Sequence, residues 1–420
     1  MSLAIWLPFT ENINTQGLEN IKFSGVNSCN ASLVSGGKIG NCYSSSSGAL
    51  VSETKIRLGP RLSMFAWVNP DFLDNMAVCG QLRGTAGTNN SGGTGACLSI
   101  NSSGAIVATI GTTYLVSKNS MVAKGVWTHI GFTLYDKIVK LYKNGQEVYS
   151  DTLGSSYAEI SDFFGVFGGA LIANSSSNPR SVNTSNIFTG KLNDVRAFSH
   201  ACSAKEVKEM AKGLVLHYKF DDKSITGGTI YDCSGYRNHG NVNGTLTSDT
   251  DAGRYTSAIY FPTNPANYIS VRTAPNIAPS LTACTIAWWE KPVTGKSMLI
   301  SGGNSTTYIA ACQETGTIYN SGVTGNPVYF KDGIKTPDTS MKYTAGEWHH
   351  YAITDISMTA FNNMIINNYV GNSSWCVNGR LNDLRIYSTV LSPEDIEGLA
   401  KVQAAVDSSG SVYTFEFKEV

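Results

Sequence analysis

The chain has 420 residues, of which 42% are hydrophobic and only 15% carry a charge. Its 31 basic residues equal its 31 acidic residues, so no excess of positive charge is available to neutralise a nucleic-acid backbone. Uncharged polar residues and 42 glycines fill the remainder, which is typical of short strands joined by many turns. We therefore expect an all-β protein that does not bind nucleic acid.

The beginning and the apolar segments of the chain predict neither export nor membrane insertion. Residues 1–9 lack the basic stretch and small-residue cleavage site of a secretory signal, and they read as a first strand. The longest apolar run, residues 163–173, is interrupted by three glycines and is far shorter than the roughly 20 residues of a membrane helix. The nine cysteines are scattered and never form a Cys-x-x-Cys pair, which predicts buried free thiols.

A long segment of the chain occurs twice. GKLNDVRAFSHACSAKEVKEMAKG at 190–213 recurs as GRLNDLRIYSTVLSPEDIEGLAKV at 379–402, and the first seven positions match with only conservative changes. Three pairs of upstream segments occur in the same order in both copies: SLAIWLPF with GLVLHYKF, FAWVNP with IAWWEKP, and GVWTHIGFTL with GEWHHYAITD. In the second and third of these pairs the two segments begin 221 residues apart. A repeat of this length predicts two domains, residues 1–212 and 213–401, followed by a C-terminal hairpin at 402–420.

Strand and helix signals can be placed within each copy. Alternation in residues 63–68 predicts a strand covered on both faces, and Trp67, Trp127, Trp288 and Trp348 are predicted core residues. Asn144 and Gly145 predict the tight turn of a hairpin. Only 33 residues separate Gly346 from Gly379, against 65 between the matching glycines of the first copy, so we expect the second copy to lack this hairpin. Ser203 and Ser392 each predict the start of a short closing helix.

The ordered set GLVLHYKFDD, DCSGYRNHG, AWW, GEWHHYAI and GRLNDLRIYSTVLSPEDI resembles the concanavalin A-like lectin/glucanase superfamily, in its laminin-G and pentraxin-like branch. The first copy, with Trp6-Leu7-Pro8 and the segments 16–20 and 37–43, resembles modules of phage tail and other virion proteins. The resemblance implies two tandem concanavalin A-like jelly-roll β-sandwiches, each made of two antiparallel sheets with one of them concave. This fold hosts lectins, glycosidases and inert spacers, so it does not by itself supply a function.

Glycosidases with this fold carry their two carboxylates on one strand as Glu-x-Asp-x-x-Glu, at the short separation that retaining hydrolysis needs. No such motif occurs in the sequence, and the nearest acidic pair, Asp221 and Asp222, has its side chains on opposite faces of a strand end. We therefore predict that the protein is not an enzyme and that it requires no cofactor.

A carbohydrate site is predicted in the second copy. Trp289 follows Trp288 directly, so its ring must lie on the opposite face of the strand, where it could stack on a sugar. Tyr308 and Tyr319 on neighbouring strands and Asn304 in the preceding loop would supply further aromatic and amide contacts. The competing interpretation is that Trp289 packs under a loop or against the first domain.

The resemblance also implies a calcium site in the second copy. Members of the superfamily often bind Ca²⁺ through an Asp of the Leu-Asn-Asp strand and oxygens of an N-terminal loop, and Asp383, Asp232 and Asn238 match that arrangement. The first copy keeps Asp194 but has no equivalent loop. The alternative is that Asp383 pairs with Arg385 or caps a turn.

These observations favour a non-enzymatic phage virion structural protein, associated with the tail or a fibre, whose lectin-like domains attach to the host surface or to a bacterial surface glycan. We expect assembly in the host cytoplasm with other virion proteins and with further copies of the chain. The first alternative is a capsid decoration or connector-associated fibre protein without a ligand. The second alternative is a glycan-active enzyme, which the missing carboxylate motif disfavours.

Overall fold

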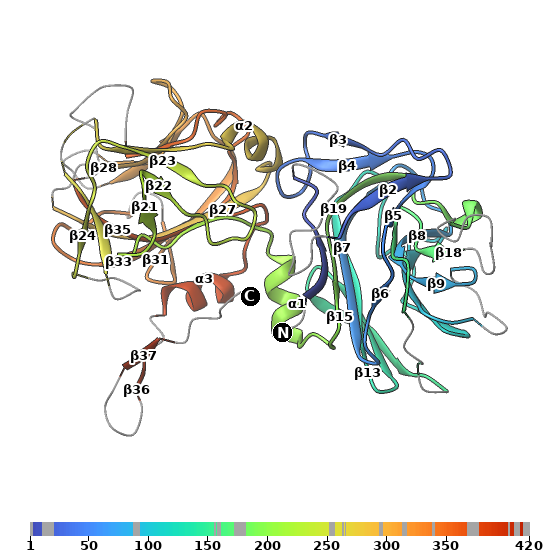
Figure 1. The fold of residues 1–420 in the computed structure, drawn as a ribbon. Helices are drawn as coiled ribbons and strands as arrows, with labels where there is room; N and C mark the ends of the chain where they lie inside the picture. Colours follow the sequence, from blue (N-terminus) through green and yellow to red (C-terminus); the bar gives the residue numbers. More distant parts are fainter. Residues whose placement is uncertain are drawn as a thin grey trace. The chain divides into compact units, whose positions relative to one another are not determined.

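In the computed structural model the chain divides between Lys212 and Gly213 into two compact units (Figure 1). The structure describes residues 3–414 except 11–20, 87–92, 155–156, 158–160, 172–181, 252–256, 263, 265, 294–296, 313–316, 338–340, 368–377, 402–403 and 407–411. Segment 16–20, part of the resemblance to virion modules, lies outside the described residues.

The first unit is built on two large antiparallel sheets. One contains the strand that carries Trp67, and we call it the tryptophan sheet. Its order is β15 (Gln146–Thr152), β14 (Ile138–Lys143), β13 (Thr128–Tyr135), β7 (Leu62–Pro70), β19 (Gly190–Phe198), β4 (Cys42–Ser45) and β3 (Ser32–Val34), with β1 (Leu3–Leu7) also paired to β19. The other is β12 (Thr113–Val116), β11 (Ile106–Ile110), β10 (Ala96–Ile100), β8 (Met76–Gly80), β17 (Gly165–Val166), β5 (Ala49–Ser52) and β2 (Phe23–Val26).

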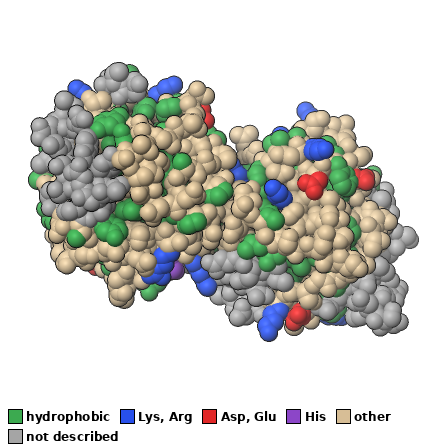
Figure 2. Space-filling view, turned by 90° about the horizontal axis from the view of Figure 1, so that it is seen from above, with side chains coloured by type: hydrophobic (Ala, Val, Ile, Leu, Met, Phe, Trp, Pro, Cys, Tyr) green, Lys and Arg blue, Asp and Glu red, His purple; other side chains and the backbone are tan. Residues whose placement is uncertain are grey.

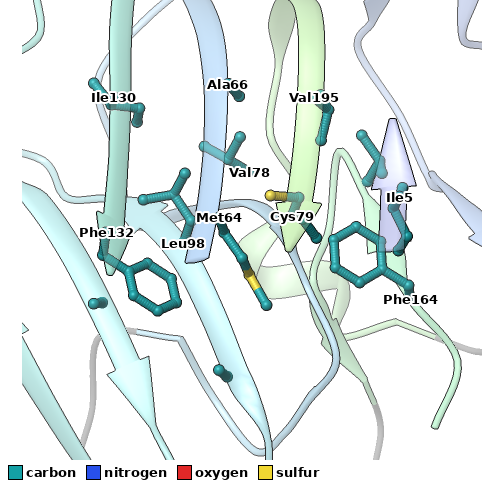
Figure 3. Close-up of a cluster of buried hydrophobic side chains, with 14 of the residues drawn as sticks. Ile5, Met64, Ala66, Val78, Cys79, Leu98, Ile130, Phe132, Phe164 and Val195 are labelled. Carbon is teal, nitrogen blue, oxygen red and sulfur yellow. The ribbon is translucent and has the colours of Figure 1, made fainter. Parts of the chain in front are cut away.

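The core of the first unit lies between these two sheets. Met64, Ala66 and Val68 alternate along β7 and pack with Val78 and Leu98 of the opposite sheet (Figure 3). Phe65 points the other way and belongs to a second cluster beneath α1 (Ala204–Ala211), with Tyr142, Phe198, Cys202 and Val207. The central strand is therefore covered on both faces, as its alternation predicts.

The second unit repeats this architecture. Its tryptophan sheet, named for Trp289, runs β24 (Thr247–Asp249), β25 (Ala258–Phe261), β35 (Gly379–Tyr387), β27 (Cys284–Pro292), β33 (His349–Ser357), β31 (Thr324–Lys331) and β32 (Ile334–Thr336), with β20 (Leu214–Tyr218) also on β35. The opposite sheet is β21 (Ile225–Thr226), β22 (Thr229–Ile230), β23 (Gly240–Asn243), β26 (Tyr268–Val271), β34 (Ile365–Ile366), β28 (Ser297–Ser301), β29 (Tyr308–Cys312) and β30 (Ile318–Ser321).

The prediction that the second copy lacks the hairpin is wrong. Strands β31 and β32 form it, at the position in the sheet that β14 and β15 occupy in the first unit. In the first unit the hairpin follows its neighbour β13 in sequence, whereas in the second it precedes the equivalent β33. The interval between Gly346 and Gly379 is short because the hairpin has been moved along the chain, not lost.

A short helix closes each unit, as the sequence predicts. Ser203 caps α1 by accepting a hydrogen bond from Glu206 N, and the Glu206 side chain completes a reciprocal capping box. Ser392 caps α3 (Pro393–Ala400) in the same way through Asp395 N. In the second unit α2 (Ala274–Ile277) and the 3-10 turn η2 (Ala278–Ser280) precede β27, and in the first η1 (Thr184–Asn186) precedes β19.

The last paired strands of the described chain are β36 (Ala404–Val406) and β37 (Val412–Thr414), which form the expected antiparallel hairpin. Smaller pairs in the first unit join β6 (Ile56–Arg57) to β16 (Ser161–Asp162) and β9 (Leu82–Arg83) to β18 (Ala170–Leu171). Among the described residues no helix is long and apolar enough to cross a membrane. Figure 2 shows a surface on which uncharged polar and backbone atoms predominate over scattered charged side chains.

None of the described cysteines forms a disulfide. Those that are buried are Cys42, Cys79, Cys97, Cys202, Cys284 and Cys312. Cys29 and Cys233 are partly exposed, and Cys376 lies outside the described residues.

Candidate functional site

The Leu-Asn-Asp-x-Arg segment of the second unit forms a β-bulge. Asp383 has a φ of 49°, and the pairing of β35 with β27 shifts register at this point. The buried Asp383 Oδ1 lies 2.8 Å from His217 Nε2 on β20 and accepts a hydrogen bond of 2.7 Å from Arg385 Nε. The Asp383 side chain therefore links the opening strand of the unit to its final strand.

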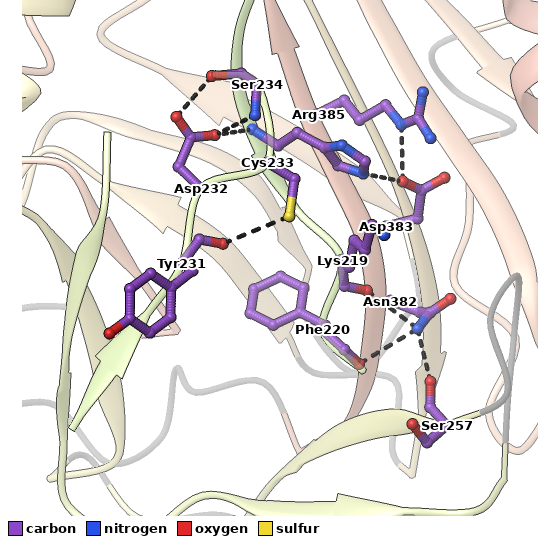
Figure 4. Close-up of polar contacts among 11 residues, drawn as sticks. Lys219, Phe220, Tyr231, Asp232, Cys233, Ser234, Ser257, Asn382, Asp383 and Arg385 are labelled. Carbon is purple, nitrogen blue, oxygen red and sulfur yellow. Dashed lines mark hydrogen bonds and ion pairs between the residues drawn. The ribbon is translucent and has the colours of Figure 1, made fainter. Parts of the chain in front are cut away.

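Asp232 and Asn238 come from the loop between β22 and β23. Asp232 is joined to this network through the backbone of His217 (Figure 4), and Asn238 is joined to it through Asp232. Asp232 Oδ1 accepts hydrogen bonds from the backbone nitrogens of His217 and Ser234, at 2.8 and 2.9 Å. Asp232 Oδ2 accepts from Ser234 Oγ and from Asn238 N, at 2.6 and 2.9 Å. The Asn238 side-chain oxygen accepts a 2.5 Å hydrogen bond from Thr273 Oγ1.

These three predicted ligands do not fit a calcium ion as they are arranged. Both oxygens of Asp232 and the side-chain oxygen of Asn238 already accept hydrogen bonds from the protein, and Asp383 contacts a guanidinium, which would repel a cation. Burial and the Arg385 charge lower the pKa of His217, so its imidazole is neutral at neutral pH. The contacts match the alternative in which Asp383 pairs with Arg385, and calcium binding stays an untested prediction.

The first unit uses the same motif for the same structural purpose. Asp194 has a φ of 51°, and its Oδ1 accepts hydrogen bonds from Trp6 Nε1 at 2.6 Å and from Arg196 Nε at 2.8 Å. Asn193 donates to the backbone oxygens of Pro8 and Asn41, as Asn382 donates to those of Lys219, Phe220 and Ser257. The repeated Leu-Asn-Asp-x-Arg sequence is therefore explained by fold stability in both units.

The structure does not bring the four predicted sugar-binding residues together. Trp289 lies in the tryptophan sheet, is 8% exposed and packs beside His350. Tyr308 and Tyr319 lie on β29 and β30 of the opposite sheet, with their rings in edge-to-face contact at 5.8 Å, and Asn304 lies in the exposed loop before β29. Trp289 points away from that sheet, so it cannot converge with the tyrosines.

A different group of side chains gathers at one end of the tryptophan sheet of the second unit. It combines two carboxylates, two cations and two aromatic rings, all partly exposed. We call it the charged aromatic cluster, and it consists of Asp249, Asp251, Tyr260, Lys291, Trp348 and Arg380.

Asp251 is the centre of this cluster. Its Oδ2 lies 2.7 Å from Lys291 Nζ and 3.6 Å from Arg380 Nε, while its Oδ1 accepts a 3.0 Å hydrogen bond from Trp348 Nε1. Arg380 also pairs with Asp249 at 2.7 Å, and its guanidinium lies 5.5 Å from the centre of the Tyr260 ring. The contacts thus run without interruption from one aromatic ring to the other.

The two carboxylates of the cluster are held in the ionised form. A hydrogen bond from the backbone of Asp251, together with Arg380, lowers the pKa of Asp249. Hydrogen bonds from Lys291 and Trp348 lower the pKa of Asp251. The cluster therefore presents two negative and two positive charges at neutral pH, and neither carboxylate can donate a proton there.

The first unit places other residues at the corresponding sheet positions. On the neighbouring strands of the second unit, Lys291 and Tyr260 lie directly opposite Arg380. In the first unit the residue equivalent to Arg380 is Lys191, and the residues directly opposite it are Asn69 and Ser44. The cluster is therefore specific to the second unit. The sequence pattern does not reveal the cluster because it predicts Trp348 in the core, whereas the indole is only partly buried.

The comparisons with known proteins bear on the fold of the first unit. Residues 44–208 match the family model described as the concanavalin A-like lectin/glucanases superfamily. The first unit is a concanavalin A-like domain. A comparison with curated proteins found no match.

Solved structures that are similar to the chain share low sequence identity with it. Domain 4 of AbnA, a GH43 extracellular arabinanase from Geobacillus stearothermophilus in complex with arabinotriose, is 15% identical, with 50% of this chain and 98% of that chain covered and a TM-score of 0.33. A heptameric SAP-like pentraxin from Limulus polyphemus is 13% identical, with 39% and 75% covered and a TM-score of 0.31. The Ruminococcus gnavus IT-sialidase CBM40 bound to α2,3 sialyllactose is 13% identical, with 36% and 82% covered and a TM-score of 0.28. At such identities and scores these structures carry no argument about function.

Proposed function

We propose that this chain is a non-enzymatic glycan-binding protein whose second unit binds saccharide at the charged aromatic cluster. The observation that carries the proposal is the continuous contact chain from Trp348 through Asp251 and Arg380 to Tyr260, on a partly exposed sheet face. Aromatic rings stack on the apolar faces of sugars, and paired charges exchange hydrogen bonds with sugar hydroxyls. The concanavalin A-like fold of the first unit is compatible with this function but does not supply it.

The charge balance of the cluster favours an uncharged saccharide. Asp249 and Asp251 offset Lys291 and Arg380, so a strongly anionic or cationic sugar gains no net attraction at this site. Sugar hydroxyls both donate and accept hydrogen bonds, and a mixed set of donors and acceptors suits them.

The electrostatics of the second unit also support a role without catalysis. A glycosidase needs one carboxyl group with a raised pKa beside an ionised one. In the cluster both carboxylates have lowered pKa values. Burial raises the pKa of Glu290, but this side chain is fully buried between the sheets, where no substrate reaches it.

We further propose that the protein is part of a phage virion and attaches to a bacterial surface glycan, together with other virion proteins and further copies of itself. The resemblance of the first copy to phage tail modules and the low proportion of charged residues, 15%, support this setting. The alternative is a capsid decoration or connector-associated protein without a ligand.

A glycan array probed with the full chain separates these functions. Selective binding to uncharged polysaccharides of bacterial envelopes would support attachment, whereas an array without any binding would favour the decoration protein. Electron microscopy of particles with an antibody against the second unit would then locate the protein on a tail, a baseplate or a capsid, or would show that it is not a virion component.

A further inference from the structure

Three potential metal ligands of different chemical types meet between β19 and α1 in the first unit. His200 Nε2 lies 3.7 Å from Cys202 Sγ and 3.5 Å from Glu206 Oε1. All three ligand atoms lie within 4.8 Å of one another. The ligands therefore offer one nitrogen, one sulfur and one oxygen around a single point.

The surrounding structure holds all three side chains in place. Glu206 Oε2 accepts hydrogen bonds of 2.7 Å from both Ser203 N and Ser203 Oγ in the capping box, which leaves Oε1 facing His200. The hydroxyl of Ser63 donates to the His200 carbonyl and accepts from Cys202 N, so it fixes the backbone between these two ligands. The His200 ring also packs edge-on against Phe198.

The two separations from His200 Nε2 are close to those of a tetrahedral zinc site. Bond lengths of about 2.0–2.3 Å give separations of roughly 3.3–3.6 Å between tetrahedral Zn²⁺ ligands. The observed 3.5 and 3.7 Å are within a few tenths of an ångström of these values. We propose that His200, Cys202 and Glu206 bind Zn²⁺ with three protein ligands and one solvent ligand, and that the ion fastens the loop after β19 to α1.

The second unit shows that the helix cap itself does not require this set. At the equivalent positions the repeated segment has Thr389, Leu391 and Asp395. Ser392 and Asp395 still form the N-terminal cap, with Asp395 N donating to Ser392 Oγ at 3.2 Å. His200 and Cys202 are therefore additions to the first unit beyond what capping needs.

The protonation of Cys202 opposes metal binding but does not prevent it. Burial raises the pKa of the Cys202 thiol to about 12, while the Ser63 hydroxyl and Arg196 act in the opposite direction. Zinc binds the thiolate and displaces the thiol proton, so the coordinate bond must offset this cost. Because His200 and Glu206 are about 30% exposed at their side chains, the ion has a route to the site from solvent.

Cobalt provides a direct spectroscopic test on the full chain. Chelator-treated, reduced protein is titrated with Co²⁺, and a thiolate-to-cobalt charge-transfer band with tetrahedral visible bands is expected at one equivalent. Cys202→Ser should remove the charge-transfer band, whereas Cys29→Ser, which changes a partly exposed thiol elsewhere in the unit, should keep it. Zn²⁺ should displace the cobalt and raise the melting temperature of the wild type but not of Cys202→Ser.

A second variant keeps the proposal testable if Cys202→Ser does not fold. His200→Asn changes a partly exposed ligand outside the core and should weaken Zn²⁺ binding by about tenfold or more. A wild type without the cobalt band, a band that persists in Cys202→Ser, or unchanged zinc affinity in His200→Asn would each overturn the proposal.

Discussion

Gly145 and Gly333 lie at the tips of equivalent hairpins, and each packs against the helix that closes its own unit. A Cβ on Gly145 would lie 3.0 Å from Lys208 Cα and 3.1 Å from Ala211 Cβ of α1. A Cβ on Gly333 would lie 3.0 Å from Glu397 Cα and 3.2 Å from Ala400 Cβ of α3. The two hairpins thus make equivalent contacts with equivalent helices, although the first hairpin follows its neighbouring strand β13 in sequence and the second precedes the equivalent strand β33.

This relationship predicts that alanine is poorly tolerated at both tips. Gly145 and Gly333 have φ values of 82° and 80°, which an alanine adopts at a cost of about 1–2 kcal/mol. The close approach to the helix should add roughly another 1–3 kcal/mol. Gly125→Ala and Gly346→Ala are the matched controls, because their φ values are 71° and 81° but nothing lies within 4 Å. Urea unfolding should show a larger loss of stability for the tip variants, and equal losses would contradict the helix contact.

Glu290 predicts a pH-dependent stability of the second unit. Its buried carboxyl group accepts hydrogen bonds from Trp288 Nε1 and Ser297 Oγ, and burial raises its pKa. Because the folded-state pKa is raised, the protonated carboxyl group stabilises the fold fully below its unfolded-state pKa of about 4.3. This stabilisation is lost as the pH rises through the folded-state pKa. Glu290→Gln cannot ionise, so it should be more stable than the wild type at pH 8, with the difference shrinking toward pH 4.

Unfolding by urea across this pH range measures the effect. Glu347→Gln serves as the control, because this carboxylate is 65% exposed. A Glu290→Gln variant whose stability follows the same pH dependence as the wild type would show that Glu290 is not the titrating group.

Asp383 predicts a loss of stability that does not depend on calcium. Asp383→Ala leaves the buried His217 and the Arg385 guanidinium without this carboxylate partner, at a cost of about 3–5 kcal/mol. The melting temperature of the full chain should fall equally in calcium and in excess chelator. If calcium instead raises the melting temperature of the wild type and not of Asp383→Ala, the ion binds here and the structural interpretation is wrong.

The C-terminal segment predicts an assembly contact. Tyr413, Phe415 and Phe417 alternate along the sequence, and an isolated two-stranded hairpin is at best marginally stable in water. Deleting residues 402–420 should leave both units folded by circular dichroism while abolishing oligomerisation or incorporation into particles. Normal assembly of the truncated chain would refute this role.

The sequence predicts the fold of this protein better than its site. The repeat, the Asn144-Gly145 turn and the two Ser caps depend on local chemistry that the sequence displays directly. The moved hairpin could have been found, because Tyr142-Lys-Asn-Gly145 resembles Phe330-Lys-Asp-Gly333, but it breaks the order in which the other matches occur.

The sugar site was misplaced because the strands of Tyr308 and Tyr319 belong to the sheet opposite Trp289, and the register of the tryptophans conceals a further equivalence between the two units. Trp67 pairs with Asn193 and Trp289 pairs with Asn382, so Trp289 and not Trp288 is the equivalent of Trp67. A shift of one residue along a strand moves each side chain to the other face of the sheet. Because FAWVNP and IAWWEKP differ in length, aligning them from their first residues introduces such a shift and equates Trp67 with Trp288. The charged aromatic cluster joins residues from five separate segments, which no local pattern brings together.

Calorimetric titration of the full chain with an uncharged envelope polysaccharide identified on the array tests the central claim most directly. Trp348→Ala and Arg380→Ala should each weaken binding by at least about tenfold, or about 1.4 kcal/mol, without lowering the melting temperature of the first unit. Trp127→Ala, the equivalent change in the first unit, should leave the affinity unchanged. Equal affinity for the wild type and both variants of the second unit would contradict glycan binding at the charged aromatic cluster.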